Sequence, residues 1–304
     1  MSSAFDPQRL IDMPPRETVA VHDARDVIMY ALGLGIGMDS ATRDATLRYV
    51  FDQDLQVLPT MAAVMAWPGF WMKEPQYGVT WQKVLHAEQS LEVFAPLPVA
   101  GELMSVLKVE RVVDKGAEKG AILYSRRDLY EGRAGTLLAT ERRGTFLRGD
   151  GARGSAGDAP VCAPHSVPAR APDAIVTLPT RGDQALLYQL SGDRNPLHID
   201  PRLAASVGFA RPILHGLCTY GVAARALIES VCEGDHARFR RMDCRFSTPV
   251  YPGETIVTHV WFDDDGAASF VARTAERDAL VLGNGQFLYH PDAATASRAR
   301  RPLQ

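Results

Sequence analysis

The sequence lacks the features that mark secreted, membrane-spanning or nucleic-acid-binding proteins. It has four cysteines in 304 residues and no C-x-x-C pair, which argues against a disulfide scaffold and predicts reduced thiols. No apolar run approaches the ~18 residues that cross a bilayer, and the first residues form no basic and apolar leader. A formal charge of −3 supplies no basic surface for nucleic acid. We therefore expect a cytoplasmic protein with no membrane or nucleic-acid partner.

The composition is that of a folded globular chain, with 46% hydrophobic and 23% charged residues. The length corresponds to about two average domains. From Gly149 to Pro172 the residues are mostly Gly, Ala, Pro and Ser, without helical or strand periodicity. This stretch predicts an N-terminal domain over residues 1–148, a linker over 149–172 and a C-terminal domain over 173–295.

The two halves repeat the same order of expected elements, and fixed offsets align them. A shift of 158 residues places Tyr30 on Tyr188, and a shift of 153 places Pro59 on Pro212. A shift of 152 aligns three further positions, Phe94 with Phe246, Gly101 with Gly253 and Glu102 with Glu254. These three registers follow one another with only small insertions between them, which indicates an internal duplication.

Eight segments with strand-like patterns follow helical segments in the two halves. Grouped strands of this kind predict an antiparallel α+β fold, and the apolar stretch Leu217 to Val231 predicts a helix that a curved sheet could wrap. The expected strands are Val84 to Phe94, Met104 to Val113, Ala121 to Leu129, Leu137 to Leu147, Phe239 to Phe246, Thr255 to Phe262, Ala268 to Thr274 and Leu280 to Tyr289.

One segment, residues 188–200, holds a carboxylate, an amide and an imidazole within six consecutive positions. Gly192 permits a turn and Pro196 fixes the backbone, so Asp193 and His198 can face a common space. A carboxylate and an imidazole that share one water can move its protons in either direction. The alternative is a surface turn followed by a helix start, because the same residue types are usual in turns.

A second segment, Arg211 to Thr219, places Gly216 at the start of the apolar helix. The unpaired backbone N–H at a helix start can donate to a carbonyl oxygen that gains negative charge. The alternative is that Gly216 only allows close packing of the helix on the sheet.

The first of these segments, Ser191-Gly192-Asp193-x-Asn195-Pro196-Leu197-His198-x-Asp200, together with Pro212-Ile213-Leu214-His215-Gly216-Leu217, closely resembles the hydratase 2 motif of the MaoC-like (R)-specific enoyl-CoA hydratases. Further matches to the two-repeat members of this family span nearly the whole chain: Tyr30-Ala31-Leu32-Gly33, Leu58-Pro59-Thr60, Val84-Leu85-His86-Ala87-Glu88-Gln89, Asp114-Lys115-Gly116 and Pro249-Val250-Tyr251-Pro252-Gly253. The resemblance implies a double hot-dog fold, in which each repeat wraps a long helix in an antiparallel sheet.

The same resemblance implies the roles of individual residues. Asp193 and His198 match the catalytic pair, Asn195 matches the amide that supports them, and the N–H of Gly216 matches the donor to the thioester carbonyl. The positions that match substrate-binding residues are His86, Ala87, Lys115, Arg194, Pro196, Leu197 and Phe246. The resemblance also implies an acyl-CoA substrate, a homodimer, and no metal ion or separate cofactor, since CoA is part of the substrate.

Two departures from the family pattern concern the site. Ala87 stands where the family usually has Gly, which adds a methyl group at a turn that lines the ligand. Gly35 falls opposite Asp193, and Ala62 and Ala63 fall opposite His215 and Gly216. We therefore expect a single active site, in the second repeat, and a first repeat that shelters the acyl chain.

The implied reaction is reversible syn addition of water to a trans-2-enoyl-CoA, with either Asp193 or His198 as the base. A hydratase for a dicarboxylic, mesaconyl-type enoyl-CoA or for a sterol-side-chain enoyl-CoA is a close alternative. A hot-dog thioesterase and a non-catalytic acyl-CoA binder are more distant alternatives, because the Gly-Asp-x-Asn-Pro-x-His block is intact.

Overall fold

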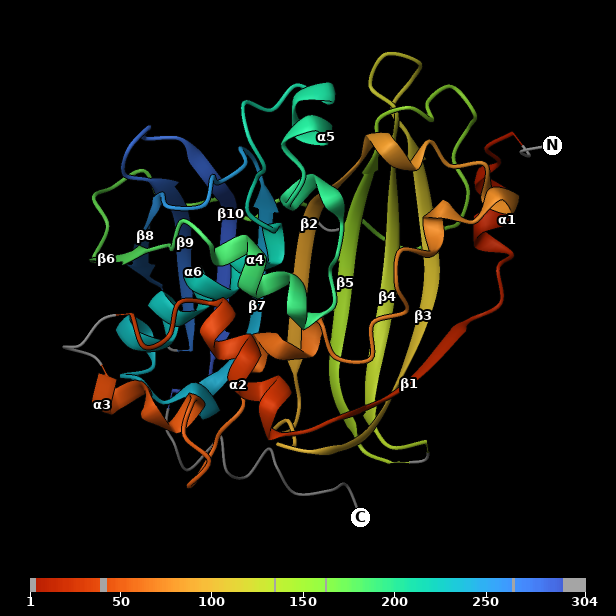
Figure 1. The fold of residues 1–304 in the computed structure, drawn as a ribbon. Coiled ribbons are helices and arrows are strands. Elements are labelled where there is room, and N and C mark those ends of the chain that lie inside the picture. The colour runs from red at the N-terminus through yellow and green to blue at the C-terminus, as the bar shows by residue number, and fades with distance from the viewer. Residues whose placement is uncertain (1–3, 39–42, 134, 162, 264–265, 292–304) are drawn as a thin grey trace.

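A computed structural model describes residues 4–38, 43–133, 135–161, 163–263 and 266–291. Its described strands form a ten-stranded antiparallel sheet in the order β1-β3-β4-β5-β2-β7-β10-β9-β8-β6. Figure 1 shows α2, α4 and α6 gathered on one face of this curved sheet. Of these helices, α6 packs mainly against β8 and β6, in the second half of the chain.

The strands are β1 (Arg16–His22), β2 (Val84–Val93), β3 (Gly101–Asp114), β4 (Ala121–Glu131), β5 (Leu137–Leu147), β6 (Ala174–Pro179), β7 (Phe239–Phe246), β8 (Thr255–Phe262), β9 (Ala267–Thr274) and β10 (Leu280–Tyr289). The α-helices are α1 (Pro7–Ile11), α2 (Ala24–Gly33), α3 (Arg43–Thr46), α4 (Gln184–Tyr188), α5 (Pro201–Ser206) and α6 (Gly216–Val231). Short 3-10 helices are η1 (Leu47–Tyr49), η2 (Pro59–Ala63), η3 (Trp71–Lys73), η4 (Pro75–Tyr77), η5 (Trp81–Lys83), η6 (Gln189–Ser191), η7 (Pro196–His198) and η8 (His236–Arg238).

All eight expected strands are confirmed within three residues at each end, and the helix expected over Leu217 to Val231 is α6. The sequence reasoning missed β1 and β6, the two edges of the sheet. Both are short and have a single neighbouring strand, and the side chains of β6 alternate only between half-buried and exposed. A strand without a fully buried face carries little of the pattern that predicts a strand.

The strand order is the same in both halves when it is counted outward from the centre. β2 and β7 pair at the centre, where Ser90 lies opposite Asp243 and Leu91 opposite Met242. The 152-residue shift places Ser90 on Met242 and Leu91 on Asp243, so this pairing is centred on the axis that relates the repeats. The tyrosines aligned by the 158-residue shift, Tyr30 and Tyr188, lie with ring centroids 6.0 Å apart. These pairings support the duplication.

One part of the expected fold is wrong: the first repeat has no long central helix in its described residues. Ala62 and Ala63, which align with the start of α6, lie in the five-residue η2. Pro68 prevents a helix from continuing through this stretch, since its ring lacks an N–H and clashes with the preceding turn. The guanidinium of Arg127 instead donates to the carbonyls of Ala62 and Met65, at 2.7 and 2.8 Å.

The expected linker is held to the sheet by hydrogen bonds along its length. The carboxylate of Asp150 accepts from the N–H and hydroxyl of Thr80, and that of Asp114 accepts from the N–H groups of Ala152 and Gly154. Further on, the side chain of His165 contacts the Ser269 hydroxyl at 2.7 Å. The linker therefore has a defined path across the molecule.

Three of the four cysteines, Cys218, Cys232 and Cys244, are buried free thiols, and Cys162 lies outside the described residues. Burial raises the pKa of the Cys218 thiol to about 12, so this thiol is protonated at neutral pH. Within the described ranges, no helix has the length and apolar character needed to span a membrane.

Candidate active site

The loop between α4 and α5 brings the predicted catalytic residues together. Gly192 ends η6 with a φ of 114°, a conformation that favours glycine, and Asp193 follows it. The N–H of Asn195 donates to the Asp193 carboxylate at 3.1 Å. The Asn195 side chain in turn accepts from the N–H of Leu197 and begins η7, which ends at His198. Asn195 therefore links the two catalytic positions, through its backbone N–H on the Asp193 side and its side chain on the His198 side.

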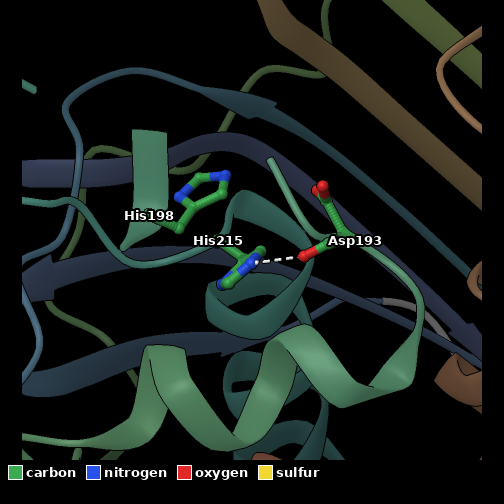
Figure 2. Close-up of side chains that lie close together, drawn as sticks. All are labelled: Asp193, His198 and His215. Atoms are coloured by element: carbon green, nitrogen blue, oxygen red, sulfur yellow. Dashed lines mark hydrogen bonds between the residues drawn. The ribbon is translucent and has the colours of Figure 1, made fainter. Parts of the chain in front are cut away.

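Asp193 and His198 form a compact cluster with a third residue, His215 (Figure 2). One carboxylate oxygen of Asp193 and one ring nitrogen of each histidine all lie within 4.8 Å of one another. The two imidazole rings stack with centroids 3.8 Å apart and an interplanar angle of 28°. The histidines are buried, whereas Asp193 is partly exposed. A water or substrate can therefore reach the carboxylate from solvent.

The hydrogen bond of His198 defines the state of its ring. Nδ1 lies 2.9 Å from the carbonyl oxygen of Ile213, and because a carbonyl only accepts, Nδ1 must carry the proton. Burial lowers the pKa of His198 below its ordinary value, although the charge of Asp193 acts in the opposite direction. The ring is therefore neutral at pH 7, and the lone pair on Nε2 remains able to take a proton.

His215 forms a hydrogen bond to the backbone of the catalytic loop. Its Nε2–H donates to the backbone carbonyl of Asp193 at 3.0 Å (Figure 2), and its ring also contacts Tyr188 at 5.1 Å between centroids. Burial, and then the neighbouring His198, lower the pKa of His215 to about 3. Its Nδ1 is buried without a hydrogen-bond partner among the described atoms. One ring nitrogen of each histidine is thus already bonded to a carbonyl, which limits what a metal ion could use.

The sequence reasoning gave no role to His215. The only available signal was its position directly before Gly216 in the second segment, and a histidine there fits equally well as a core residue. Its main partner is a backbone carbonyl 22 residues away, which no side-chain pattern reports.

Gly216 is the first residue of α6, so its N–H belongs to the unpaired donors of a helix start. A Cβ at this position would lie 3.2 Å from a ring carbon of Phe246, which is tighter than most such contacts. Phe246 also lies 4.5 Å from the ring of His86, measured between centroids. The helix start, Phe246 and His86 therefore form a continuous wall.

Beside this wall, a cavity of about 500 Å³ is lined by three of the predicted substrate residues, Ala87, Lys115 and Phe246. Ala87 sits at an irregularity in the pairing of β2 with β5, which turns its methyl group toward the cavity. Arg245 also lines the cavity and forms an ion pair with Glu88 at 2.6 Å. The linker residues Val161, Ala163 and Pro164 close another side, a contribution that the sequence did not indicate.

The remaining predicted substrate residues are not brought to this cavity. Arg194 and Pro196 are exposed on the catalytic loop, and Leu197 is half-buried there. None of the three lines the 500 Å³ cavity. They lie beside Asp193 and His198 on the same loop, and their contact with a substrate stays a prediction.

On the first-repeat side, His86 lies next to a buried group of charges. Burial, followed by the charge of Arg143, lowers the pKa of His86 to about 3. Glu141 accepts hydrogen bonds from Arg127 and Arg143, at 2.9 and 2.6 Å, and from Gln89 at 3.0 Å. His86 is therefore a neutral ring near this cavity and next to a cluster of one carboxylate and two guanidinium groups.

Comparisons with known proteins agree with this geometry. The family description "MaoC like domain" matches residues 165–279, and "MFE-2 hydratase 2 N-terminal domain" matches residues 21–149. A protein of Mycobacterium tuberculosis named 3-hydroxyacyl-thioester dehydratase Y is 41% identical over 87% of this chain and 92% of its own. A protein of Arabidopsis thaliana named enoyl-CoA hydratase 2, peroxisomal, is 37% identical over 92% of this chain and 94% of its own.

Solved structures show the same relationship. A MaoC-like dehydratase from Phytophthora capsici is 36% identical, with a TM-score of 0.82 over 94% of this chain and 99% of its own. A Mycobacterium tuberculosis protein described as a double hotdog fold has 14% identity and a TM-score of 0.54, over 91% of this chain and 97% of its own, and supports the fold alone. The fold is therefore a double hot-dog. The chain belongs to the MaoC-like hydratase 2 family, in its two-repeat form.

Proposed function

We propose that this protein is a hydro-lyase that reversibly hydrates a trans-2-enoyl-CoA to the (3R)-3-hydroxyacyl-CoA. The observation that carries the proposal is the neutral His198 ring beside the Asp193 carboxylate, next to the helix start at Gly216. Relatives named enoyl-CoA hydratase 2 or peroxisomal multifunctional enzyme type 2, at 36–37% identity, support the same activity.

Asp193 and His198 hold the water in this mechanism. The water donates one hydrogen bond to the carboxylate and one to Nε2 of His198. As its oxygen attacks C3, Nε2 takes a proton, and the nearby carboxylate stabilises the imidazolium that forms. The imidazolium then returns a proton to C2 on the same face, so both atoms of the double bond receive their groups from one side.

The thioester carbonyl gains negative charge as C3 is attacked. The N–H of Gly216 donates to this oxygen, and the field of the 16-residue α6 adds to the effect at the helix N-terminus. Loss of a donor of this kind typically raises a barrier by about 3 kcal/mol. If Gly216 only allowed the helix to pack closely on the sheet, there would be no reason for the helix start to lie beside Asp193 and His198.

The rest of the substrate follows the cavity beside Phe246. Lys115 is exposed at its rim and can pair with a phosphate of CoA. A local cation is needed there because a chain with a net charge of −3 has no extended basic surface to bind the phosphate. The acyl chain passes His86 toward the first repeat. We further propose that the enzyme works without a separate cofactor, as a homodimer in the cytoplasm, in β-oxidation of fatty acids.

A series of trans-2-enoyl-CoA substrates, from four carbons upward, tests the activity. We expect loss of the conjugated enoyl absorbance and a product of exclusively (3R) configuration. Release of free CoA without hydration would overturn the proposal in favour of a thioesterase. Parallel assays with a dicarboxylic and a sterol-side-chain enoyl-CoA test the narrower alternatives, since a preference for either would redefine the substrate.

A further inference from the structure

A second cavity, of about 370 Å³, lies at the other end of α6 from Gly216. Its lining includes Asp235, His236 and Ala237, which follow the last residue of α6, Val231, by only a few positions. A helix of 16 residues is about 24 Å long, so this cavity lies far from the catalytic pair. Its size falls within the range of small-molecule sites.

The repeat symmetry relates this cavity to the one in the proposed active site. The 152-residue shift places Ala87 on Phe239 and Phe94 on Phe246. Ala87 and Phe246 line the substrate cavity, whereas Phe94 and Phe239 line the second cavity. Because β2 and β7 pair antiparallel at the centre of the sheet, each end of this pair carries one of the two cavities. The second cavity is thus the first repeat's counterpart of the substrate site.

The counterpart has lost the groups that carry out the reaction and kept its apolar walls. Gly35 aligns with Asp193, and Ala63 aligns with Gly216 at the end of η2 rather than at the start of a long helix. The walls contain Val57, Leu97 and the two phenylalanines. A ligand could therefore be held in this cavity but not hydrated by an aligned acid–base pair.

Two polar groups in the lining indicate the kind of ligand. The side-chain Oε1 of Gln56 is buried and has no hydrogen-bond partner in the described structure. A buried acceptor of this kind favours a ligand with an N–H or O–H group. Arg48 adds a half-buried cation to the same lining. The acyl-phosphopantetheine arm of an acyl-CoA offers an apolar chain, amide N–H groups and a phosphate. These groups match the apolar walls, Gln56 and Arg48, respectively.

We propose that this second cavity binds another molecule of acyl-CoA without converting it. The proposal rests on the proposed function, because the ligand class is taken from the substrate of the paired site. Two acyl-CoA molecules then bind per chain, one at each end of the central β2–β7 pair.

Titration calorimetry with decanoyl-CoA tests the proposal, because this saturated thioester binds but cannot be hydrated. We expect two binding events per chain in the unmodified protein. Ala237→Trp should fill the cavity and remove one event while enoyl-CoA hydration stays within about twofold. Ala237→Ser is the matched control and should keep both events. A single event in the unmodified protein, or two events that Ala237→Trp leaves unchanged, would overturn the proposal.

A second variant covers the case in which Ala237→Trp does not fold. Gln56→Leu keeps the side-chain size but removes the buried acceptor, and should weaken one of the two events by about tenfold. Equal affinities in Gln56→Leu and the unmodified protein would overturn the proposal. Failure of the hydration assay with both events present would instead overturn the proposed function alone, so the two failures can be told apart.

Discussion

The second repeat places a 16-residue apolar helix, α6, inside its strands, whereas the first repeat places the short turn η2 in the aligned position. The inner side of β9, beneath α6, carries the fully buried Ala268, Phe270 and Ala272. The inner side of β4, beneath η2, carries Arg127 instead, which donates to two carbonyls of the turn and its continuation. One repeat therefore begins a long helix whose first N–H groups are available to donate, and in the other the backbone carbonyls at the aligned position accept hydrogen bonds from Arg127.

In the core of the first repeat, one carboxylate, Glu141, is shared by two guanidinium groups. Burial opposes ionisation of Glu141, but Arg143 and Arg127 outweigh it and lower its pKa to about 2. The ring of Trp67 lies 4.1 Å from the guanidinium of Arg143. The comparison teaches that the position of a helix start in one repeat can be filled in the other by a short turn held by buried charged groups.

Removing the chemistry of the second repeat should have the largest effect. Asp193→Asn and His198→Gln each retain side-chain size but remove a proton acceptor, so we expect kcat for hydration to fall by about 10³-fold. The measurement is steady-state hydration kinetics, with thermal unfolding as a check on folding. Asp278→Asn is the matched control: this exposed carboxylate forms an ion pair with Arg273, and activity should not change. Retained turnover in both site variants would contradict the assigned pair.

Breaking the ionic core of the first repeat should affect stability instead of chemistry. Glu141→Gln leaves the buried guanidinium of Arg127 and the partly buried one of Arg143 without this counter-charge, and we expect a loss of about 3–5 kcal/mol in the free energy of unfolding. Urea denaturation measures the loss. Asp183→Asn breaks an exposed ion pair with Arg181 and should cost less than about 1 kcal/mol. Equal losses in the two variants would show that the buried cluster does not hold the repeat together.

His215 belongs to the second repeat and should act on catalysis through the loop. His215→Phe keeps an aromatic ring beside His198 but removes the donor to the Asp193 carbonyl. We expect kcat to fall by about 10–100-fold with little change in KM, equal to about 1.4–2.7 kcal/mol of barrier. His215→Gln retains an N–H donor and should recover part of the rate. A variant with a lower melting temperature but unchanged kcat would assign His215 a structural role only.

The differences between the repeats were only partly predictable from the sequence. The long inner strands could be predicted because a buried face alternates with an exposed one, and the catalytic loop because Gly, Pro and Asn have fixed turn preferences. The ionic core could not, since Arg127 and Glu141 meet only through the pairing of β4 with β5. The signal was present in Arg127, a charged residue at an inward position of β4, but it does not identify a partner.

The pH dependence of stability should distinguish the repeats by a smaller effect. His86 in the first repeat and His215 in the second have pKa values lowered to about 3, mainly by burial, against 6.5 in the unfolded chain. Between pH 6.5 and 3 the unfolded state therefore binds more protons, and stability falls by about 1.4 kcal/mol per pH unit for each ring. Above pH 6.5 neither contributes. Glu141 adds a loss of stability only below pH 4.5, the ordinary pKa of its carboxyl group.

Urea denaturation at pH 7.5, 6.5 and 5.5 tests this prediction. The free energy of unfolding should fall more steeply between pH 6.5 and 5.5 than between pH 7.5 and 6.5. His86→Phe should reduce the fall in the lower interval by the contribution of one histidine ring. An unchanged slope in His86→Phe would mean that His86 takes up its proton at the same pH in the folded and the unfolded chain, and that burial does not hold the ring neutral.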